Sequence, residues 1–289
     1  MEQLTVNQLT KRYRHQIILE NVSFKLEPAK IYGLLGRNGA GKTTLLNIIS
    51  NRIFPTDGEV KLGDEKVDNN DQALGKIFLM SEANLYPREM KLSQSFDLAD
   101  ATYDDFNYSQ AERLAKLFEL DTDSKITNFS TGQRTLSKLI VALAVNADYI
   151  FLDEPILGLD ATHRDLFYQE LVRTYQERPR TFVLSTHLIS EIQQLIEHVL
   201  ILDQHRILID EPLEELLAKA YEISGPAKLV DAYTAGLNVL QTTDLGNIRT
   251  NYVLDHLDEQ RVIPDQIKID HYDLQHLFIY LTEGGAKNV

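Results

Sequence analysis

Hydrophobic residues recur with two different periods along the first fifty positions, and each period predicts a different element. From Val22 to Leu26 apolar and polar residues alternate, and short apolar runs at 4–6 and 17–19 precede them, so a largely antiparallel N-terminal β subdomain is expected. Residues 31–35 form a nearly continuous apolar run instead, which is typical of a strand that is buried on both faces. Residues 43–51 show the spacing of a helix. The pattern therefore predicts a strand, a glycine-rich segment and a helix in this order.

Strand-like and helix-like segments continue to alternate up to about residue 220. Strands are predicted at 59–62, 77–80, 149–152, 181–184, 199–202 and 206–209, and helices at 136–145, 162–176, 190–196 and 213–220. The stretch 92–120 is mostly helical by its spacing, so we expect an inserted helical subdomain at about 87–147. Such alternation predicts an α/β core, in which a mixed and mostly parallel sheet is covered by helices on both faces.

The last seventy residues have a different pattern. Gly225-Pro226 is interpreted as the linker region, and the remainder predicts a strand, a helix, two strands and a final helix. The final helix has Leu274, Leu277, Phe278 and Leu281 on one face. We therefore expect one large domain at 1–217 and a small α+β domain at 218–289.

Composition and charge narrow the possible partners and compartments. The 289 residues include 29 basic and 43 acidic side chains, a net charge of −14 that repels a phosphate backbone, so no nucleic acid partner is expected. No run approaches the roughly 20 apolar residues of a membrane span, and the first residues show no signal region, so a cytosolic chain is expected. The absence of cysteine excludes disulfides, thiolate zinc sites and cysteine nucleophiles.

The glycine-rich segment matches the phosphate-loop pattern G-x-x-x-x-G-K-[ST] in full. Its glycines let backbone N–H groups converge on phosphate oxygens, Lys42 reaches the β- and γ-phosphates, and Thr43 ligates Mg²⁺. The residues expected to bind a nucleotide here are Gly36, Asn38, Gly39, Ala40, Gly41, Lys42, Thr43 and Thr44. A chance turn is disfavoured because a strand precedes the loop and a helix follows it. The loop alone does not separate kinases, GTPases and ATPases.

Two further segments add candidate chemistry. Asp153 and Glu154 follow the buried strand 149–152, where the first carboxylate suits Mg²⁺ and the second suits a water that attacks the γ-phosphorus. The alternative is that both carboxylates only cap the next helix. Residues 128–133 are typical of a helix N-terminus with Ser130 as its cap, and such an end also binds anions.

These motifs, in this order, resemble the ABC ATPase family over roughly Leu4 to Leu217. The matching segments are Ser130-Thr131-Gly132-Gln133 for the signature, Asp153-Glu154-Pro155 for the Walker B strand, Gly158-Leu159-Asp160 for the D-loop, Ser185-Thr186-His187 for the switch histidine, and Tyr13 for the aromatic that stacks on adenine.

The resemblance implies a head-to-tail dimer with a second ATP-binding subunit, identical or different. Ser130, Gly132 and Gln133 of one subunit would then complete the site formed by residues 36–44 of the other. It further implies ATP and Mg²⁺ as cofactors and a role for each matched residue. Glu154 is the implied general base, Asp153 and Thr43 hold Mg²⁺, Lys42 and His187 stabilise the γ-phosphate, and Asp160 communicates between the sites.

The chain departs from the family pattern at three places. Glu82 follows the strand 77–80 at a position where the family usually has glutamine. An ionised carboxylate can ligate Mg²⁺ but cannot donate a hydrogen bond. The change is therefore expected to affect the strength of coupling to the transmembrane partner. Thr131 replaces the first signature glycine and is expected to be tolerated, because Gly132 makes the closer phosphate approach in the family. Ala29-Lys30 replaces a usual glycine, which is expected to change a turn without affecting catalysis.

The resemblance implies the motor subunit of an ABC transporter, held on the cytoplasmic face of the cell membrane by transmembrane permease subunits. Residues 83–87 would lie at the groove for the permease, and residues 274–282 resemble the tail helix of exporter subunits, so export of a peptide, antibiotic or lipid-like substrate is expected. One alternative is a soluble ABC ATPase acting on the ribosome or DNA, although the chain has one cassette and no coiled-coil insert. A regulatory sensor is the other alternative, although Glu154 and His187 are both present.

Overall fold

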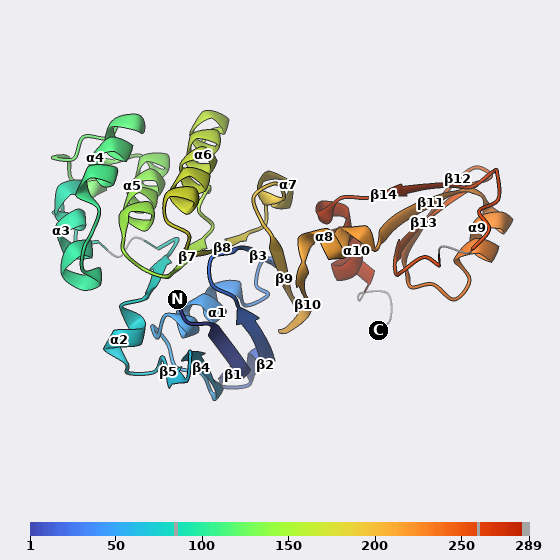
Figure 1. Ribbon diagram of the computed structural model, residues 1–289, viewed down its shortest axis with the longest axis horizontal. Helices are drawn as coiled ribbons and strands as arrows, with labels where there is room; N and C mark the ends of the chain where they lie inside the picture. The colour runs from blue at the N-terminus through green and yellow to red at the C-terminus, as the bar shows by residue number, and fades with distance from the viewer. Residues whose placement is uncertain (84–85, 259–260, 285–289) are drawn as a thin grey trace. The chain divides into compact units, whose positions relative to one another are not determined.

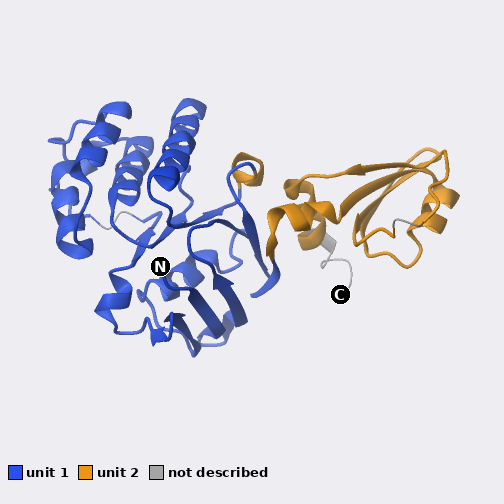
Figure 2. Ribbon diagram, viewed as in Figure 1, with its two compact units in different colours: residues 1–187, 194–210 blue, residues 188–193, 211–289 orange. Residues whose placement is uncertain are grey.

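The computed structural model describes residues 1–83, 86–258 and 261–284, which fall into two compact units (Figure 2). Unit 1 contains residues 1–187 and 194–210, and unit 2 contains the described part of 188–193 and 211–289. Asn84 and Leu85, expected at the permease groove, lie outside the described residues. Among the described residues, no helix combines the length and the apolar character that crossing a membrane requires.

Unit 1 begins with a four-stranded sheet of order β2-β1-β4-β5, in which neighbouring strands pair antiparallel. Its strands are β1 (Leu4–Tyr13), β2 (Gln16–Leu26), β4 (Asp57–Leu62) and β5 (Glu65–Lys66). The predicted antiparallel β subdomain is thereby confirmed. The apolar run at 17–19 and the alternating stretch from Val22 to Leu26 belong to the single strand β2, in which Asn21 takes a φ of 50°.

The larger sheet of unit 1 has six strands in the order β10-β9-β3-β8-β7-β6. They are β3 (Ile31–Leu35), β6 (Ile77–Met80), β7 (Tyr149–Asp153), β8 (Thr181–Thr186), β9 (His198–Asp203) and β10 (Arg206–Pro212). β3 pairs in parallel with β8 and β9, and β7 pairs in parallel with β6 and β8. The carboxyl ends of β3, β6, β7 and β8 therefore meet at one edge, which is where ligands bind in open parallel sheets.

Helices complete unit 1 (Figure 1). They are α1 (Lys42–Ile49), α2 (Asp71–Leu74), α3 (Leu92–Tyr103), α4 (Tyr108–Leu117), the short 3₁₀ turn η1 (Ile126–Asn128), α5 (Thr131–Ala144) and α6 (Ala161–Glu177). The chain leaves the sheet after β6, forms α3, α4 and α5 side by side, and returns in β7. α5 packs on both α3 and α4, which fixes the helix that begins at the predicted signature.

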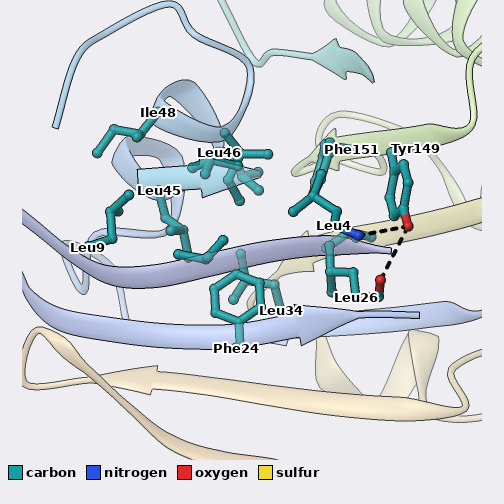
Figure 3. Packing of buried hydrophobic residues seen from close by; sticks show 14 of the residues in the cluster. Leu4, Leu9, Phe24, Leu26, Leu34, Leu45, Leu46, Ile48, Tyr149 and Phe151 are labelled. Carbon is teal, nitrogen blue, oxygen red and sulfur yellow. Dashed lines mark hydrogen bonds between the residues drawn. The ribbon is translucent and has the colours of Figure 1, made fainter. Parts of the chain in front are cut away.

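One hydrophobic core joins the two sheets of unit 1 to α1. Leu45 and Leu46 of α1 pack in the same cluster as Leu4 of β1 and Phe24 of β2 (Figure 3). The hydroxyl of Tyr149, a fully buried residue of β7, accepts the Leu4 N–H at 3.1 Å and lies 3.2 Å from the Leu26 carbonyl, to which it can donate. This core fixes the direction of α1 and of the loop before it.

Unit 2 contains a four-stranded antiparallel sheet of order β12-β13-β11-β14 together with helices, in agreement with the predicted α+β fold. Its elements are α7 (Ile189–Ile192), α8 (Leu213–Ala218), β11 (Ala220–Pro226), α9 (Ala227–Thr234), β12 (Val239–Leu245), β13 (Ile248–Leu254), β14 (Lys268–His271) and α10 (Leu274–Gly284). Leu274 and Leu277 of α10 are fully buried.

Three sequence predictions in this part of the chain are wrong. Gly225-Pro226 is not a linker, because both residues belong to β11 and pair with β13. A Cβ at Gly225 would lie 2.6 Å from the Gln266 carbonyl, so the glycine permits close backbone approach. The helix predicted at 213–220 ends at Ala218, and the one predicted at 190–196 covers only Ile189–Ile192. The short strand β14 was not predicted at all.

Candidate active site

The phosphate loop fills the connection between β3, which ends at Leu35, and α1, which begins at Lys42. A Cβ at Gly36 would lie 2.5 Å from the Leu202 carbonyl, and one at Gly41 would lie 2.9 Å from the Ile18 carbonyl. Gly41 also has a φ of 108°, a conformation that side chains disfavour. Glycine is therefore needed at both positions for the loop to pack on β9 and β2 and to present its backbone to a ligand.

A cavity of about 630 Å³ opens at this loop in unit 1. It is lined by Gln16, Ile18, Arg37, Asn38, Gly39, Gly41, Lys42, Thr43, Thr44, Glu82, Asp153, Glu154, Leu157 and His187. Ten of these fourteen residues were predicted as site residues, and they come from four segments that are far apart in the sequence. Four were missed: Gln16 and Ile18 lie on one face of β2 by period two, Arg37 occupies a variable position of the phosphate loop, and Leu157 lies between the Walker B and D-loop segments.

Seven predicted residues do not line this cavity. Gly36 and Ala40 belong to the phosphate loop but do not line the cavity, and a Cβ at Gly36 would lie 3.3 Å from the Ala40 methyl. Tyr13, predicted to stack on adenine, is 48% exposed at the end of β1, with the Lys11 ammonium 4.7 Å from its ring centre. Gln16 and Ile18, which follow it closely in sequence, do line the cavity, and the role predicted for Tyr13 stays a prediction. The remaining four, Ser130, Gly132, Gln133 and Asp160, lie around a separate pocket.

Lys42 brings a buried cation to the cavity. The residue is only 7% exposed, and its ammonium donates a hydrogen bond of 2.6 Å to the Gly36 carbonyl. Burial lowers the pKa of Lys42, while the carboxylates of Glu154 and Asp153 oppose that shift. A cation held among backbone carbonyls at a helix N-terminus is suited to bind phosphate.

Asp153 lies at the end of β7 and is almost fully buried. One carboxylate oxygen accepts the Thr43 hydroxyl at 2.8 Å, and the other accepts the Ser185 hydroxyl at 3.0 Å. Among the residues that the structure describes, no three histidines, cysteines or acids gather as a metal cage. One buried carboxylate beside one hydroxyl fits Mg²⁺, which takes few protein ligands and fills its remaining positions with phosphate oxygens and water.

Glu154 has a left-handed backbone, with a φ of 49°. Its N–H donates to the Ser185 carbonyl at 2.8 Å, and its carboxylate accepts the Thr186 hydroxyl at 3.2 Å and lies 3.0 Å from His187 Nδ1. Such strained conformations persist only where the surroundings hold them, and they concentrate at functional sites. The sheet edge thus presents a carboxylate and an imidazole side by side at the cavity.

A second pocket of unit 1, of about 250 Å³, shares no lining residue with the first. Ser130 caps α5 by accepting the Gln133 N–H at 3.2 Å, and the Gln133 side chain accepts the Ser130 N–H at 2.9 Å. Asp160 caps α6 by accepting the His163 N–H at 2.9 Å, and that bond, together with the imidazole, lowers the pKa of Asp160. A Cβ at Gly132 would lie 2.8 Å from the Gly158 carbonyl, so the first turn of α5 packs closely against the backbone just before α6.

Comparisons with known proteins agree on one family. Residues 19–157 match the sequence model described as ABC transporter. The putative ABC transporter ATP-binding protein AlbC of Bacillus subtilis is 31% identical over 226 residues, 73% of this chain and 93% of that protein. The Nod factor export ATP-binding protein I of Burkholderia thailandensis is 29% identical over 232 residues, 76% of this chain and 75% of that protein.

The likeness also extends to an importer subunit and to a solved structure. The petrobactin import ATP-binding protein YclP of Bacillus subtilis is 27% identical over 247 residues, 80% of this chain and 98% of that protein. A structure described as the ATP binding subunit of an ABC transporter superposes with a TM-score of 0.67 at 24% identity, covering 74% of this chain and 91% of that chain. The predicted α/β fold of the phosphate-loop ATPases is thereby confirmed.

Proposed function

Because the chain belongs to the family of ABC transporter ATP-binding proteins, we propose that it is the motor subunit that drives export of a substrate through separate membrane subunits. Family membership makes it an ATP-binding and ATP-hydrolysing subunit of a transporter. One observation carries the mechanism: the cavity at the phosphate loop and the pocket at Ser130 share no residue. In this proposal the two are the half-sites that each chain contributes to a head-to-tail pair, and ATP is enclosed only when two subunits pair.

Each residue of the first half-site has a distinct part in binding ATP. Lys42 and the loop N–H groups bind the β- and γ-phosphates, Tyr13 stacks on adenine, and Gln16 and Ile18 line the cavity next to it in sequence. Thr43, Asp153 and Glu82 hold Mg²⁺, which when bound neutralises charge on the phosphates. This assignment is supported by the Thr43 to Asp153 hydrogen bond and by the position of Glu82 on the same cavity.

Glu154 is the general base of the reaction. Its carboxylate accepts a proton from a water that attacks the γ-phosphorus in line, and His187 orients that carboxylate and contacts the γ-phosphate. The bond of 3.0 Å between His187 and Glu154 and the 3.2 Å bond from Thr186 support this arrangement, because together they hold the carboxylate at the cavity.

The second half-site serves the ATP of the partner subunit. Ser130, Gly132 and Gln133 present the N-terminus of α5 to the γ-phosphate bound by the other subunit, and Asp160 lies at the contact between the two sites. The second ATP-binding subunit is either a copy of this chain or a homologous one. ATP binding closes the pair, and hydrolysis reopens it.

The chain divides by function at about residue 217. Residues 1–217 form the ATP-binding domain, with the permease contact at the helical subdomain of about 87–147, and residues 218–289 form an accessory domain. Transmembrane permease subunits hold the chain at the cytoplasmic face of the membrane. Relatives include subunits named for export and for import, and the resemblance of α10 to exporter tails favours export of a peptide, antibiotic or lipid-like substrate.

Replacing the general base tests this proposal. Glu154→Gln should retain ATP binding and reduce steady-state hydrolysis by about 100-fold or more, because the attacking water loses its proton acceptor. Glu112→Gln, an exposed residue of α4, is the matched control and should hydrolyse ATP normally. Unchanged hydrolysis by Glu154→Gln would refute the assignment of the base. Purification of the tagged chain should recover a multi-span membrane protein, and recovery of only ribosomes or DNA would refute the transport role.

A further inference from the structure

A single lysine joins α5 to the segment that carries Glu82. Lys138 lies two turns from the start of α5, and its ammonium donates to three consecutive carbonyls. The distances are 3.0 Å to Ser81, 2.6 Å to Glu82 and 3.0 Å to Ala83. We call residues 81–83 the lid segment. All three N–H donors of the ammonium are thus used on one short stretch of backbone.

Lys138 is suited to hold this segment. It is half-buried, burial lowers its pKa, and the Glu82 carboxylate opposes that shift. The ammonium stabilises three carbonyl oxygens that converge on one point, because its positive charge offsets the repulsion between their partial negative charges. A neutral side chain of equal length would fill the space and leave those oxygens without their donors.

The first turns of α5 also contact the segment that leaves β7. The Thr135 hydroxyl lies 3.0 Å from the Leu157 carbonyl, and Gly132 approaches the backbone of Gly158. Leu157 and Glu82 both line the ATP cavity, whereas Gly132 lines the second pocket. The N-terminus of α5 therefore lines the second pocket, while its Thr135 and Lys138 side chains bond to the Leu157 and Glu82 carbonyls of two residues that line the ATP cavity.

We propose that Lys138 is a positioning residue that couples the two ATP sites of the dimer. It fixes Glu82 in the site of its own subunit relative to Ser130 and Gly132, which face the ATP of the partner. If Glu82 moves inward when its site is occupied, the Lys138 hydrogen bonds would move α5 with the lid segment and align the second half-site. The inference rests on the proposed function, and such coupling is reciprocal between the two sites.

Three substitutions test the coupling. Lys138→Met removes the ammonium and keeps the length, Lys138→Arg keeps donors to the carbonyls, and Lys116→Met removes an exposed lysine of the neighbouring α4 as a control. Each is combined with Glu154→Gln, and ATP is titrated while size-exclusion chromatography with light scattering measures the dimer fraction. In chains with Glu154 intact, the Hill coefficient of ATP hydrolysis and the melting temperature are measured as well.

Lys138→Met should raise the ATP concentration at half-dimerisation by about tenfold and reduce the Hill coefficient from about 2 towards 1. Lys138→Arg should restore both values substantially, and Lys116→Met should change neither. A lower melting temperature with unchanged dimerisation and cooperativity would overturn the proposal, because Lys138 would then only stabilise the fold. Should Lys138→Met fail to fold, Lys138→Gln in the same titration decides the question by the same two values.

The outcomes separate this inference from the proposed function. A dimer that forms equally well with and without Lys138 overturns only the coupling. Failure of Glu154→Gln itself to dimerise with ATP overturns the two-half-site mechanism and the coupling together.

Discussion

Gly41 and Gly39 of the phosphate loop provide a matched pair of substitutions that separates two effects. Both have left-handed backbones, with φ of 108° and 83°. A Cβ at Gly41 would lie 2.9 Å from both the Ile18 carbonyl and a Leu19 methyl, whereas a Cβ at Gly39 would have no heavy atom within 4 Å. Both alanine variants therefore strain the backbone, but only Gly41→Ala also overlaps β2.

The two effects have different magnitudes. Left-handed backbone at a residue with a Cβ costs about 1–2 kcal/mol. Overpacking against a fixed neighbour adds about 1–3 kcal/mol. We therefore expect Gly39→Ala to lower the free energy of unfolding of unit 1 by about 1–2 kcal/mol and Gly41→Ala to lower it by about 2–5 kcal/mol. Because Ile18 also lines the cavity, Gly41→Ala should weaken ATP binding too.

Urea denaturation followed by tyrosine fluorescence measures the unfolding energies, since the chain has 13 tyrosines and no tryptophan. Calorimetric titration with ATP measures binding. Equal unfolding energies for the two variants would refute the argument, because the contact between Gly41 and β2 would then have no energetic weight.

Two further predictions concern the core and the metal. Tyr149→Phe should lower the free energy of unfolding by about 1–3 kcal/mol, because the buried Leu4 N–H loses its acceptor. Tyr13→Phe, at an exposed position, is the control. Equal effects of the two substitutions in urea denaturation would contradict the role of the Tyr149 hydroxyl. Asp153→Asn should weaken the Mg²⁺-dependent part of ATP binding by about 10- to 100-fold and leave binding in EDTA nearly unchanged. Titrations with and without Mg²⁺ measure that difference, and an equal loss in both would point to a general defect of the loop.

Much of the large domain could be predicted because local pattern and tertiary structure agree there. The apolar run of β3 leads directly into a loop in which close approach requires Gly36 and Gly41, and Asp153 ends a buried strand. The linker prediction at Gly225-Pro226 is wrong because a glycine needed for close backbone contact and a glycine of a linker look alike in sequence. The short strand β14 has an exposed, polar composition and gains its identity only from pairing with β11.

The parts of the site that sequence did not indicate depend on backbone partners. Lys138 bonds carbonyls that are 55 to 57 positions away, and a carbonyl leaves no trace in residue type. Gln16 and Ile18 line the cavity from the start of β2, whereas Tyr13 at the end of β1 is exposed. Motifs therefore identified the reactive groups, and the fold determined which neighbours hold them.

The mass of the Glu154→Gln chain in the presence of ATP tests the central claim most directly. One chain has a mass of 33.0 kDa, so two half-sites that close over ATP should give a particle of twice that mass by light scattering. Without nucleotide, or with Lys42→Met added, the mass should return to that of one chain. A particle that binds ATP at full occupancy and keeps the mass of one chain would contradict the account, because a single chain would then form the complete site.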